Sequence, residues 1–181
     1  MKIKIIKDNN PIMRKKSLPV DLPLSIEDRD TLNSMTEYLK LSQDEKYAKA
    51  HNIRTGVGLA AIQIGLLKRM FVVYYPNGDG TETNLQLVNP KIIETSIRKV
   101  ALSSGEGCLS VDKDHKGLVH RYNKIKIKAY NAVNDEEVVI SARGYDAIVL
   151  QHEYDHLDGI LYYDRIDKNH PDSPVMNEEI I

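Results

Sequence analysis

The chain has 181 residues, of which 41% are hydrophobic and 28% charged, and this suits one globular domain with its own core. Its formal net charge of -1 implies no strongly basic face, so nucleic acid is not an expected partner. No apolar run is long enough to cross a membrane, the N-terminus lacks the apolar core of a signal peptide, and the single cysteine excludes an internal disulfide and indicates a reducing, cytoplasmic setting.

The N-terminal part predicts a short edge strand and one longer helix. Residues 2–6 alternate weakly between polar and apolar, as in an edge strand. Ser25 with Asp28 resembles a helix N-cap, and apolar residues then recur at helical spacing, so we expect a helix from there to about Ala50. Its second half, from Ser42, is polar and predicts either a separate helix or a loop.

Three glycines frame an apolar run in the segment G-V-G-L-A-A-I-Q-I-G, residues 56–65. This pattern is only weak evidence for a phosphate-binding loop, because no third glycine follows at the needed spacing and no Lys-Ser/Thr follows. The alternative is a buried turn at which the backbone approaches another group closely. Gln63 is the one polar side chain of the run, and a buried amide needs a partner. It therefore either makes a structural hydrogen bond or faces a substrate.

Strand patterns follow, separated by turns. Residues 70–75 and 84–89 predict two strands joined through the turn P-N-G-D-G, with Pro90 ending the second. Residues 124–130 alternate Ile and Lys, as in a half-buried strand, and a turn returns the chain into residues 138–140. We expect this hairpin to lead directly into the next helix.

The stretch Q-H-E-Y-D-H-L-D-G, residues 151–159, contains an H-E-x-x-H motif. Helical positions i and i+4 share a face, so His152 and His156 can bind one metal ion, with Glu153 beside a water on that ion. Two of the helix faces are apolar, which is typical of a buried helix. We expect this helix to be the central one, with Ser141 as its N-cap.

The H-E-x-x-H motif by itself does not prove a metal site. At this composition it arises by chance in about one such chain in a hundred. A zinc endopeptidase would show the same motif and take a third ligand from further along, where Glu178 and Glu179 are available. A lone cysteine such as Cys108 is most often a buried inert thiol.

The remaining C-terminal residues predict little regular structure. Residues 160–163 predict a final short strand, and the polar tail from about residue 167 is expected to be loosely held. No repeat or linker interrupts the chain, so we expect a single domain over residues 1–181. The predicted fold class is α+β, with antiparallel sheets and hairpins packed around a central metal-binding helix and a longer N-terminal helix.

Three motifs, taken together and in this order, resemble the peptide deformylase family. They are G-φ-G-φ-A-A-x-Q at residues 56–63, E-G-C-L-S at residues 106–110 and H-E-x-D-H-L at residues 152–157. The resemblance covers residues 3–166 and is closer to the Gram-positive and mycoplasma-like branch of the family. Ile62 stands where many members have proline, and this difference affects no residue that has a chemical role.

The resemblance implies that Cys108 is the third metal ligand beside His152 and His156. Three protein ligands leave a fourth position for water, as a catalytic site requires, and a thiolate suits a softer ion. The family implies Fe(II) as the native ion, with Zn, Ni or Co as substitutes. A zinc endopeptidase, in which Cys108 would be dispensable, and a catalytically silent metal-binding relative remain the rival hypotheses.

The implied activity is removal of the N-formyl group from the formyl-methionine of newly made polypeptides, with release of formate. Metal-bound water would attack the formyl carbon, with Glu153 as general base and then general acid. The implied oxyanion donors are the Gln63 side-chain amide and the Leu109 backbone N–H. The implied partners are nascent formyl-methionyl peptides, in proximity to the ribosome, without direct binding to nucleic acid or membrane. A cytoplasmic monomer is expected.

The methionine side chain of such a substrate needs an apolar pocket. Helix geometry places Tyr145, Ile148 and Val149 on the ligand face, one to two turns before the histidines. Val57 and Gly58 match the edge that receives substrate in the family. The alternative is that these apolar residues are ordinary core.

Arg121 is expected to organise the surroundings of the metal ligands. It precedes the strand at 124–130 and matches a family position implied to pair with Glu106. We hypothesise that it bridges Glu106, and also Asp155, because buried carboxylates need a cation or several donors. The alternative is a solvated surface arginine.

Overall fold

Two sheets and three α-helices make up residues 3–181, the part of the chain that the computed structural model describes. One sheet is antiparallel, in the order β1-β2-β3-β6-β7, and the other has the order β5-β4-β8, in which β8 runs parallel to β4. This arrangement confirms the predicted α+β class. The helices are α1 (Ile26–Gln43), α2 (Glu45–His51) and α3 (Tyr145–Leu157), with short 3-10 helices η1 (Pro11–Arg14), η2 (Ala61–Ile64) and η3 (Tyr162–Arg165). The strands are β1 (Gly58–Ala60), β2 (Met70–Pro76), β3 (Glu82–Thr95), β4 (Lys99–Ala101), β5 (Arg121–Tyr122), β6 (Lys124–Asn131), β7 (Glu136–Arg143) and β8 (Glu178–Ile180).

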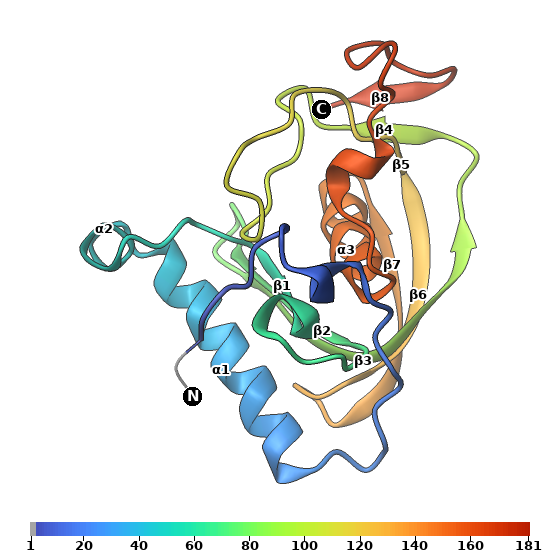
Figure 1. Ribbon diagram of the computed structural model, residues 1–181. Helices are drawn as coiled ribbons and strands as arrows, with labels where there is room; N and C mark the ends of the chain where they lie inside the picture. The colour runs from blue at the N-terminus through green and yellow to red at the C-terminus, as the bar shows by residue number, and fades with distance from the viewer. Residues whose placement is uncertain (1–2) are drawn as a thin grey trace.

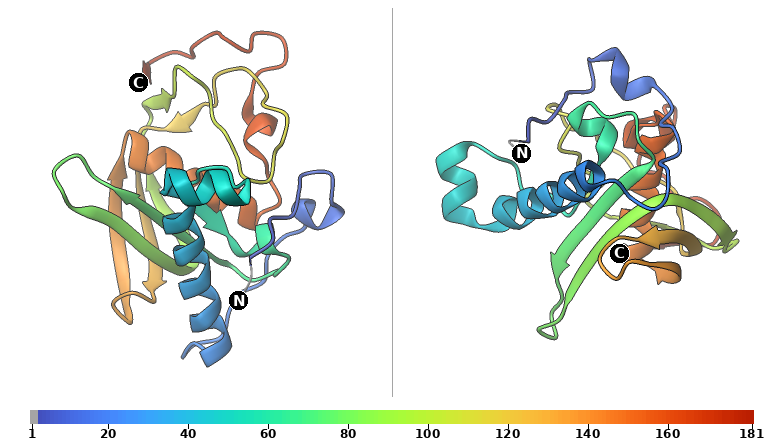
Figure 2. Two further views of the ribbon diagram at one scale, coloured as in Figure 1. Left: turned by 90° about the vertical axis from the view of Figure 1, so that its left-hand side faces the viewer. Right: turned by 90° about the horizontal axis from the view of Figure 1, so that it is seen from below.

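Strand β2 is apolar on both faces because a helix covers each of them. Alternate residues of a strand point to opposite faces of the sheet. Phe71 and Val73 pack into a cluster with residues of α3, whereas Met70 and Val72 pack with residues of α1. The run 70–73 is therefore buried on two sides, and α1 and α3 sandwich this end of the large sheet (Figure 2).

Helix α3 lies at the centre of the molecule (Figure 1), in contact with β1, β2 and β7 of the large sheet and β5 of the small one. It begins at Tyr145, so the predicted start near Ser141 is wrong. Ser141 pairs with Lys126 in the β6–β7 ladder, which continues to Arg143. Gly144, with φ of 56°, then makes the sharp turn from strand into helix, a conformation that glycine adopts without a side-chain clash.

The N-terminal helix forms as predicted at its start. The Ser25 side chain accepts a hydrogen bond from the Asp28 backbone N–H. The polar second half is a separate helix, α2, because the Asp44 side chain caps a new first turn. No helix among residues 3–181 is both long and apolar enough to cross a membrane.

The predicted edge strand at residues 2–6 is wrong over its described part, residues 3–6, and Lys2 lies outside the described residues. The Ile6 N–H instead donates to the Gln63 carbonyl, so this segment is bonded to η2 and not to a sheet edge. Strand β3 does not end at residue 89 but continues through Pro90 to Thr95, because its pairing with β6 shifts register there.

The predicted strand at residues 160–163 is also wrong. These residues enter the 3-10 helix η3, whose start is fixed by the Asp164 carboxylate, which accepts the Leu161 N–H at 2.8 Å. The expected loose tail is wrong for residues 178–180, which form β8 beside β4. That pairing joins segments about 80 residues apart, which no local pattern signals.

We predict that Gly159→Ala lowers the free energy of unfolding by about 2–4 kcal/mol. Gly159 ends α3 with φ of +73°, and a Cβ there would meet the Arg14 carbonyl oxygen at 2.6 Å. A left-handed alanine costs about 1–2 kcal/mol, and forcing an atom into packed backbone adds a similar amount. Denaturant titration measures the loss. Gly80→Ala is the matched control, since Gly80 has φ of +84° and open space around it. Equal losses in the two variants would contradict the close approach at Gly159.

Candidate metal centre

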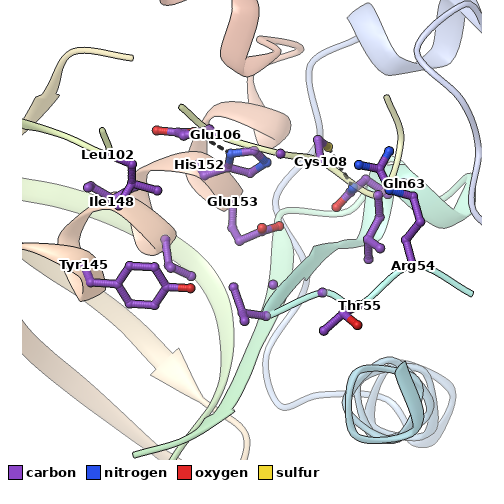
Figure 3. Close-up of a pocket in the computed structure, with 16 residues that line it drawn as sticks. Arg54, Thr55, Gln63, Leu102, Glu106, Cys108, Tyr145, Ile148, His152 and Glu153 are labelled. Atoms are coloured by element: carbon purple, nitrogen blue, oxygen red, sulfur yellow. Dashed lines mark hydrogen bonds and ion pairs between the residues drawn. The ribbon is translucent and has the colours of Figure 1, made fainter. Parts of the chain in front are cut away.

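Three side chains from two distant segments meet beside α3. The Cys108 sulfur and one nitrogen each of His152 and His156 lie within 4.8 Å of one another. Cys108 Sγ is 3.3 Å from His156 Nε2. Cys108 lies in the loop between β4 and β5, and Figure 3 shows it beside His152 of α3. The structure therefore brings together the three predicted ligands.

The donor set fits a divalent transition metal. It contains one sulfur and two imidazole nitrogens with no carboxylate, and such ligands select zinc, iron and similar ions over magnesium or calcium. His152 Nδ1 bonds to Glu106 Oε2 at 2.8 Å, which leaves its Nε2 for the ion. Three ligands also leave room for a water in the coordination shell.

Glu153 is the carboxylate next to this cluster. It is only 4% exposed, and its Oε2 has no hydrogen-bond partner within the described chain, although the residue lines the central pocket. Burial raises the pKa of Glu153 to about 7. A carboxyl group with such a pKa can both accept and release a proton near neutral pH.

Gly58 creates the space for that carboxylate. A Cβ at Gly58 would lie 2.3 Å from Glu153 Oε1. The second framing glycine, Gly56, similarly faces Leu109, whose Cδ1 would lie 2.7 Å from an added Cβ. The glycine-framed segment is therefore the buried turn of close approach, and not a phosphate-binding loop.

Gln63 makes a structural hydrogen bond and also faces the site. Its Oε1 accepts the Ala60 N–H at 2.8 Å, which fixes the direction of the amide. Its Nε2 then points to Ser110 Oγ at 3.1 Å and to Cys108 Sγ at 3.5 Å. The structural hydrogen bond is thus present, and the amide nitrogen lies beside Cys108 at the candidate site (Figure 3).

The hypothesised bridge through Arg121 is present. Its Nε and Nη2 each donate to the Glu106 carboxylate at 2.8 Å, and its Nη1 donates to Asp155. Arg121 is only 2% exposed, so the solvated alternative is wrong. Burial alone would raise the pKa of Glu106, but Arg121 and the hydrogen bond with His152 lower it to about 2. Glu106 is therefore an anion that Arg121 holds against His152, one of the three candidate ligands.

A pocket of about 270 Å³ opens beside the three ligands. All five predicted substrate-binding residues line it, and Tyr145 is 41% exposed at its rim. The predicted set is Val57, Gly58, Tyr145, Ile148 and Val149. Sequence reasoning missed Arg54, Thr55, Leu102 and Gly107, which also line the pocket. Gly107 lies inside the E-G-C-L-S motif, so that motif could have indicated it as a pocket residue. Arg54 and Thr55 end a stretch of sequence that has no recognisable pattern.

The third ligands that a zinc endopeptidase would need are engaged elsewhere. Glu178 accepts a hydrogen bond from His120, and Glu179 accepts one from Asn123 at 2.7 Å. Both belong to β8, which is anchored to β4 in the small sheet. This arrangement counts against the endopeptidase hypothesis.

Comparisons with known proteins agree on one family. The family model described as "Polypeptide deformylase" matches residues 2–172. A peptide deformylase of Staphylococcus epidermidis is 48% identical over 171 residues, covering 94% of this chain and 93% of that protein. One of Halalkalibacterium halodurans is 47% identical over 163 residues, covering 90% and 89%. The solved structure of peptide deformylase from Thermotoga maritima superposes with a TM-score of 0.71 at 30% identity, covering 92% of this chain and 99% of that one.

We predict that Arg121→Ala destabilises the protein by about 3–5 kcal/mol, because it leaves buried carboxylates unpaired. Metal affinity should fall by about 10- to 100-fold, as is typical when a group that orients a ligand is lost. Thermal unfolding and competitive metal titration measure the two effects. Arg165→Ala is the control, since Arg165 also contacts Asp155 but its side chain is 40% exposed. An Arg121→Ala protein as stable as the control, with full metal affinity, would contradict the role of the bridge.

Proposed function

This chain belongs to the peptide deformylase family, and we propose that Cys108, His152 and His156 hold the metal ion of its reaction. Members of the family are hydrolases that remove the N-formyl group from nascent polypeptides, and this is the function of the chain. The observation that carries the site assignment is the convergence of three potential metal-binding atoms beside a buried carboxylate, Glu153, which lines the same pocket.

We propose Fe(II) as the native ion, with Zn, Ni or Co able to replace it. One thiolate and two imidazoles suit any of these ions. When bound, the metal supplies a Lewis acid that lowers the pKa of a water and polarises the formyl oxygen.

Glu153 moves the protons of the reaction. As water adds to the formyl carbon, the Glu153 carboxylate accepts its proton, and the oxygen without a partner, Oε2, is available to do so. The same carboxyl group then gives the proton to the methionine nitrogen as the C–N bond breaks. The products are formate and a free N-terminal amine.

Two donors are proposed to stabilise the negative charge that develops on the formyl oxygen. One is Gln63 Nε2, whose direction is fixed by the bond from the Ala60 N–H to the other end of the amide. The other is the Leu109 N–H, which bonds to no other group within residues 3–181. Such a donor is typically worth about 100- to 1000-fold in turnover.

The pocket residues select the methionine side chain. Ile148 and Val149 are buried on α3, and Val57, on the segment before β1, also lines the pocket. Burial of an unbranched thioether side chain against apolar side chains of this kind lowers the free energy of binding by itself. We further propose that the protein acts as a single-domain monomer in the cytoplasm near the ribosome, where its substrates emerge.

Formate release from formyl-Met-Ala, measured without oxygen after loading with Fe(II) or Ni(II), tests the proposal. Turnover of this peptide, with no cleavage of internal peptide bonds, is the expected result. Cys108→Ala should lose the metal and the activity together. Cleavage of internal bonds, or full activity in Cys108→Ala, would support an endopeptidase instead.

We predict that Glu153→Ala keeps the fold and the bound metal but lowers the turnover number by about 100- to 10,000-fold, the usual contribution of a general base. Turnover, metal content by elemental analysis and the melting temperature are measured on one preparation. Glu94→Ala, at an exposed position far from the pocket, is the control. Metal content well below that of the control would show that Glu153 is a ligand and not a proton carrier.

We predict that the Fe(II) form loses activity in air much faster than the Ni(II) form. Fe(II) beside a thiolate at an open site is oxidised by oxygen, and the Cys108 sulfur is then exposed to further oxidation. The half-life of formate release in aerated buffer measures this, with an anaerobic sample of each form as reference. Equal half-lives in air would argue against Fe(II)–thiolate ligation.

A further inference from the structure

The N-terminal segment is hydrogen-bonded to both parts of the chain that carry the proposed oxyanion donors. The Ile6 N–H donates to the Gln63 backbone carbonyl at 2.8 Å, and the Asp8 N–H donates to the Ser110 carbonyl at 2.8 Å. Gln63 carries the first proposed donor, and Ser110 directly follows the residue that carries the second. We call residues 6–8 the N-terminal support, because this segment links two regions that are far apart in the sequence.

Lys7 makes the third contact of the N-terminal support. Its Nζ donates to the Leu109 carbonyl oxygen at 3.0 Å and lies 2.6 Å from the Asp112 carboxylate. A hydrogen bond from a charged donor is roughly twice as strong as a neutral one. An ion pair to a carboxylate as exposed as that of Asp112, at 69%, contributes little. The bond to the Leu109 carbonyl is therefore the contact through which Lys7 acts on the site.

Packed side chains hold the N-terminal support in place. Ile6 packs against the core cluster that includes residues of α3, whereas the neighbouring Ile5 packs against the cluster that includes residues of α1. At the other end of the segment, the Asp8 carboxylate accepts a hydrogen bond from the Tyr163 hydroxyl at 3.3 Å. Close-packed interiors deform little, so a segment fixed in this way can keep the groups bonded to it in position.

The loop that the N-terminal support holds has no helix or strand of its own. The Leu109 N–H in this loop bonds to no other group within residues 3–181. Gln63 Nε2 donates to Ser110 Oγ at 3.1 Å, so the two donor segments are bonded to each other as well as to the support. An oxyanion donor is effective only where the negative charge develops, and a misplacement of about 1 Å can lower turnover by about 100-fold.

We propose that the N-terminal support positions both oxyanion donors, with Lys7 as its positioning residue. The proposal rests on the proposed function, because Gln63 and Leu109 stabilise an oxyanion only if the chain acts on a formyl group. Lys7 is not among the residues that line the pocket, so it acts through Leu109 and not on the bound peptide. Since the oxyanion forms only during the reaction, loss of Lys7 should lower kcat and leave KM unchanged.

Three variants of the full-length, Ni(II)-loaded protein test the proposal. Lys7→Met removes the donor and keeps an unbranched side chain, Lys7→Arg keeps a charged donor, and Lys4→Met is the matched control. Lys4 is exposed, and its side chain makes no hydrogen bond or ion pair within the described residues. The kcat and KM for formate release from formyl-Met-Ala are measured together with metal content and melting temperature, at a temperature where every variant is folded.

Lys7→Met should lower kcat by about 10- to 100-fold, with KM and metal content within about twofold of wild type. Lys7→Arg should recover most of the lost kcat, because its guanidinium can also donate to the Leu109 carbonyl. Lys4→Met should match the wild-type protein. An unchanged kcat in Lys7→Met, a loss that appears in KM instead, or a Lys7→Arg protein as slow as Lys7→Met would overturn the proposal.

Backbone amide signals give a readout that does not depend on activity. In isotope-labelled protein loaded with Zn(II), a diamagnetic ion, the Leu109 and Ser110 amide signals should shift or broaden in Lys7→Met and keep their positions in Lys4→Met. Unchanged signals in Lys7→Met would overturn the proposal.

The two proposals fail in different ways. A wild-type protein that releases no formate would contradict the proposed function. A wild-type protein that releases formate, together with a Lys7→Met protein that is equally fast and has the same amide signals, would contradict the role of the N-terminal support alone.

Discussion

A buried guanidinium holds the candidate metal centre together. Arg121 comes from β5, and its two carboxylate partners come from the Cys108 loop and from α3. Each of these charges would be costly in the interior alone, and each becomes tolerable only when its partners are in place. Arg165 adds a second cation to Asp155, so two carboxylates face two guanidinium groups. The loop that carries Cys108 has no helix or strand of its own, and this ion network supplies the rigidity that secondary structure does not.

The site places polar groups in an apolar interior and makes room for each of them. Gly58 admits the Glu153 carboxylate, and the neighbouring turn aims the Gln63 amide at Cys108. An interior of low polarity strengthens every hydrogen bond and charge interaction made within it. The short apolar strand β1 is therefore both core and wall of the pocket.

The sequence predicts best what depends on local spacing. The four-residue interval between His152 and His156 sufficed to place both on one face of a helix, and Ser25 marked the start of α1. Cys108 lies 44 residues before His152, so residue spacing alone left it open, and only the resemblance assigned it. The misplaced start of α3 has a similar cause: Ser141 is a good N-cap residue, but its strand pairing with Lys126 outweighs that preference. Arg54 enters the pocket through tertiary contacts that no local pattern encodes.

Strand β8 sets an order of events in biosynthesis. It pairs with β4, which leads directly into the Cys108 loop, and the Ser103 N–H bonds to the Ile181 carbonyl. Translation proceeds from the N-terminus, so residues 58, 63, 108 and 121 leave the ribosome before the histidines do, and β4 receives its last partner later still. During synthesis this chain is therefore a deformylase without an active centre. The candidate cluster can therefore assemble only after α3 has been synthesised, which makes its assembly a late step in the folding of this chain.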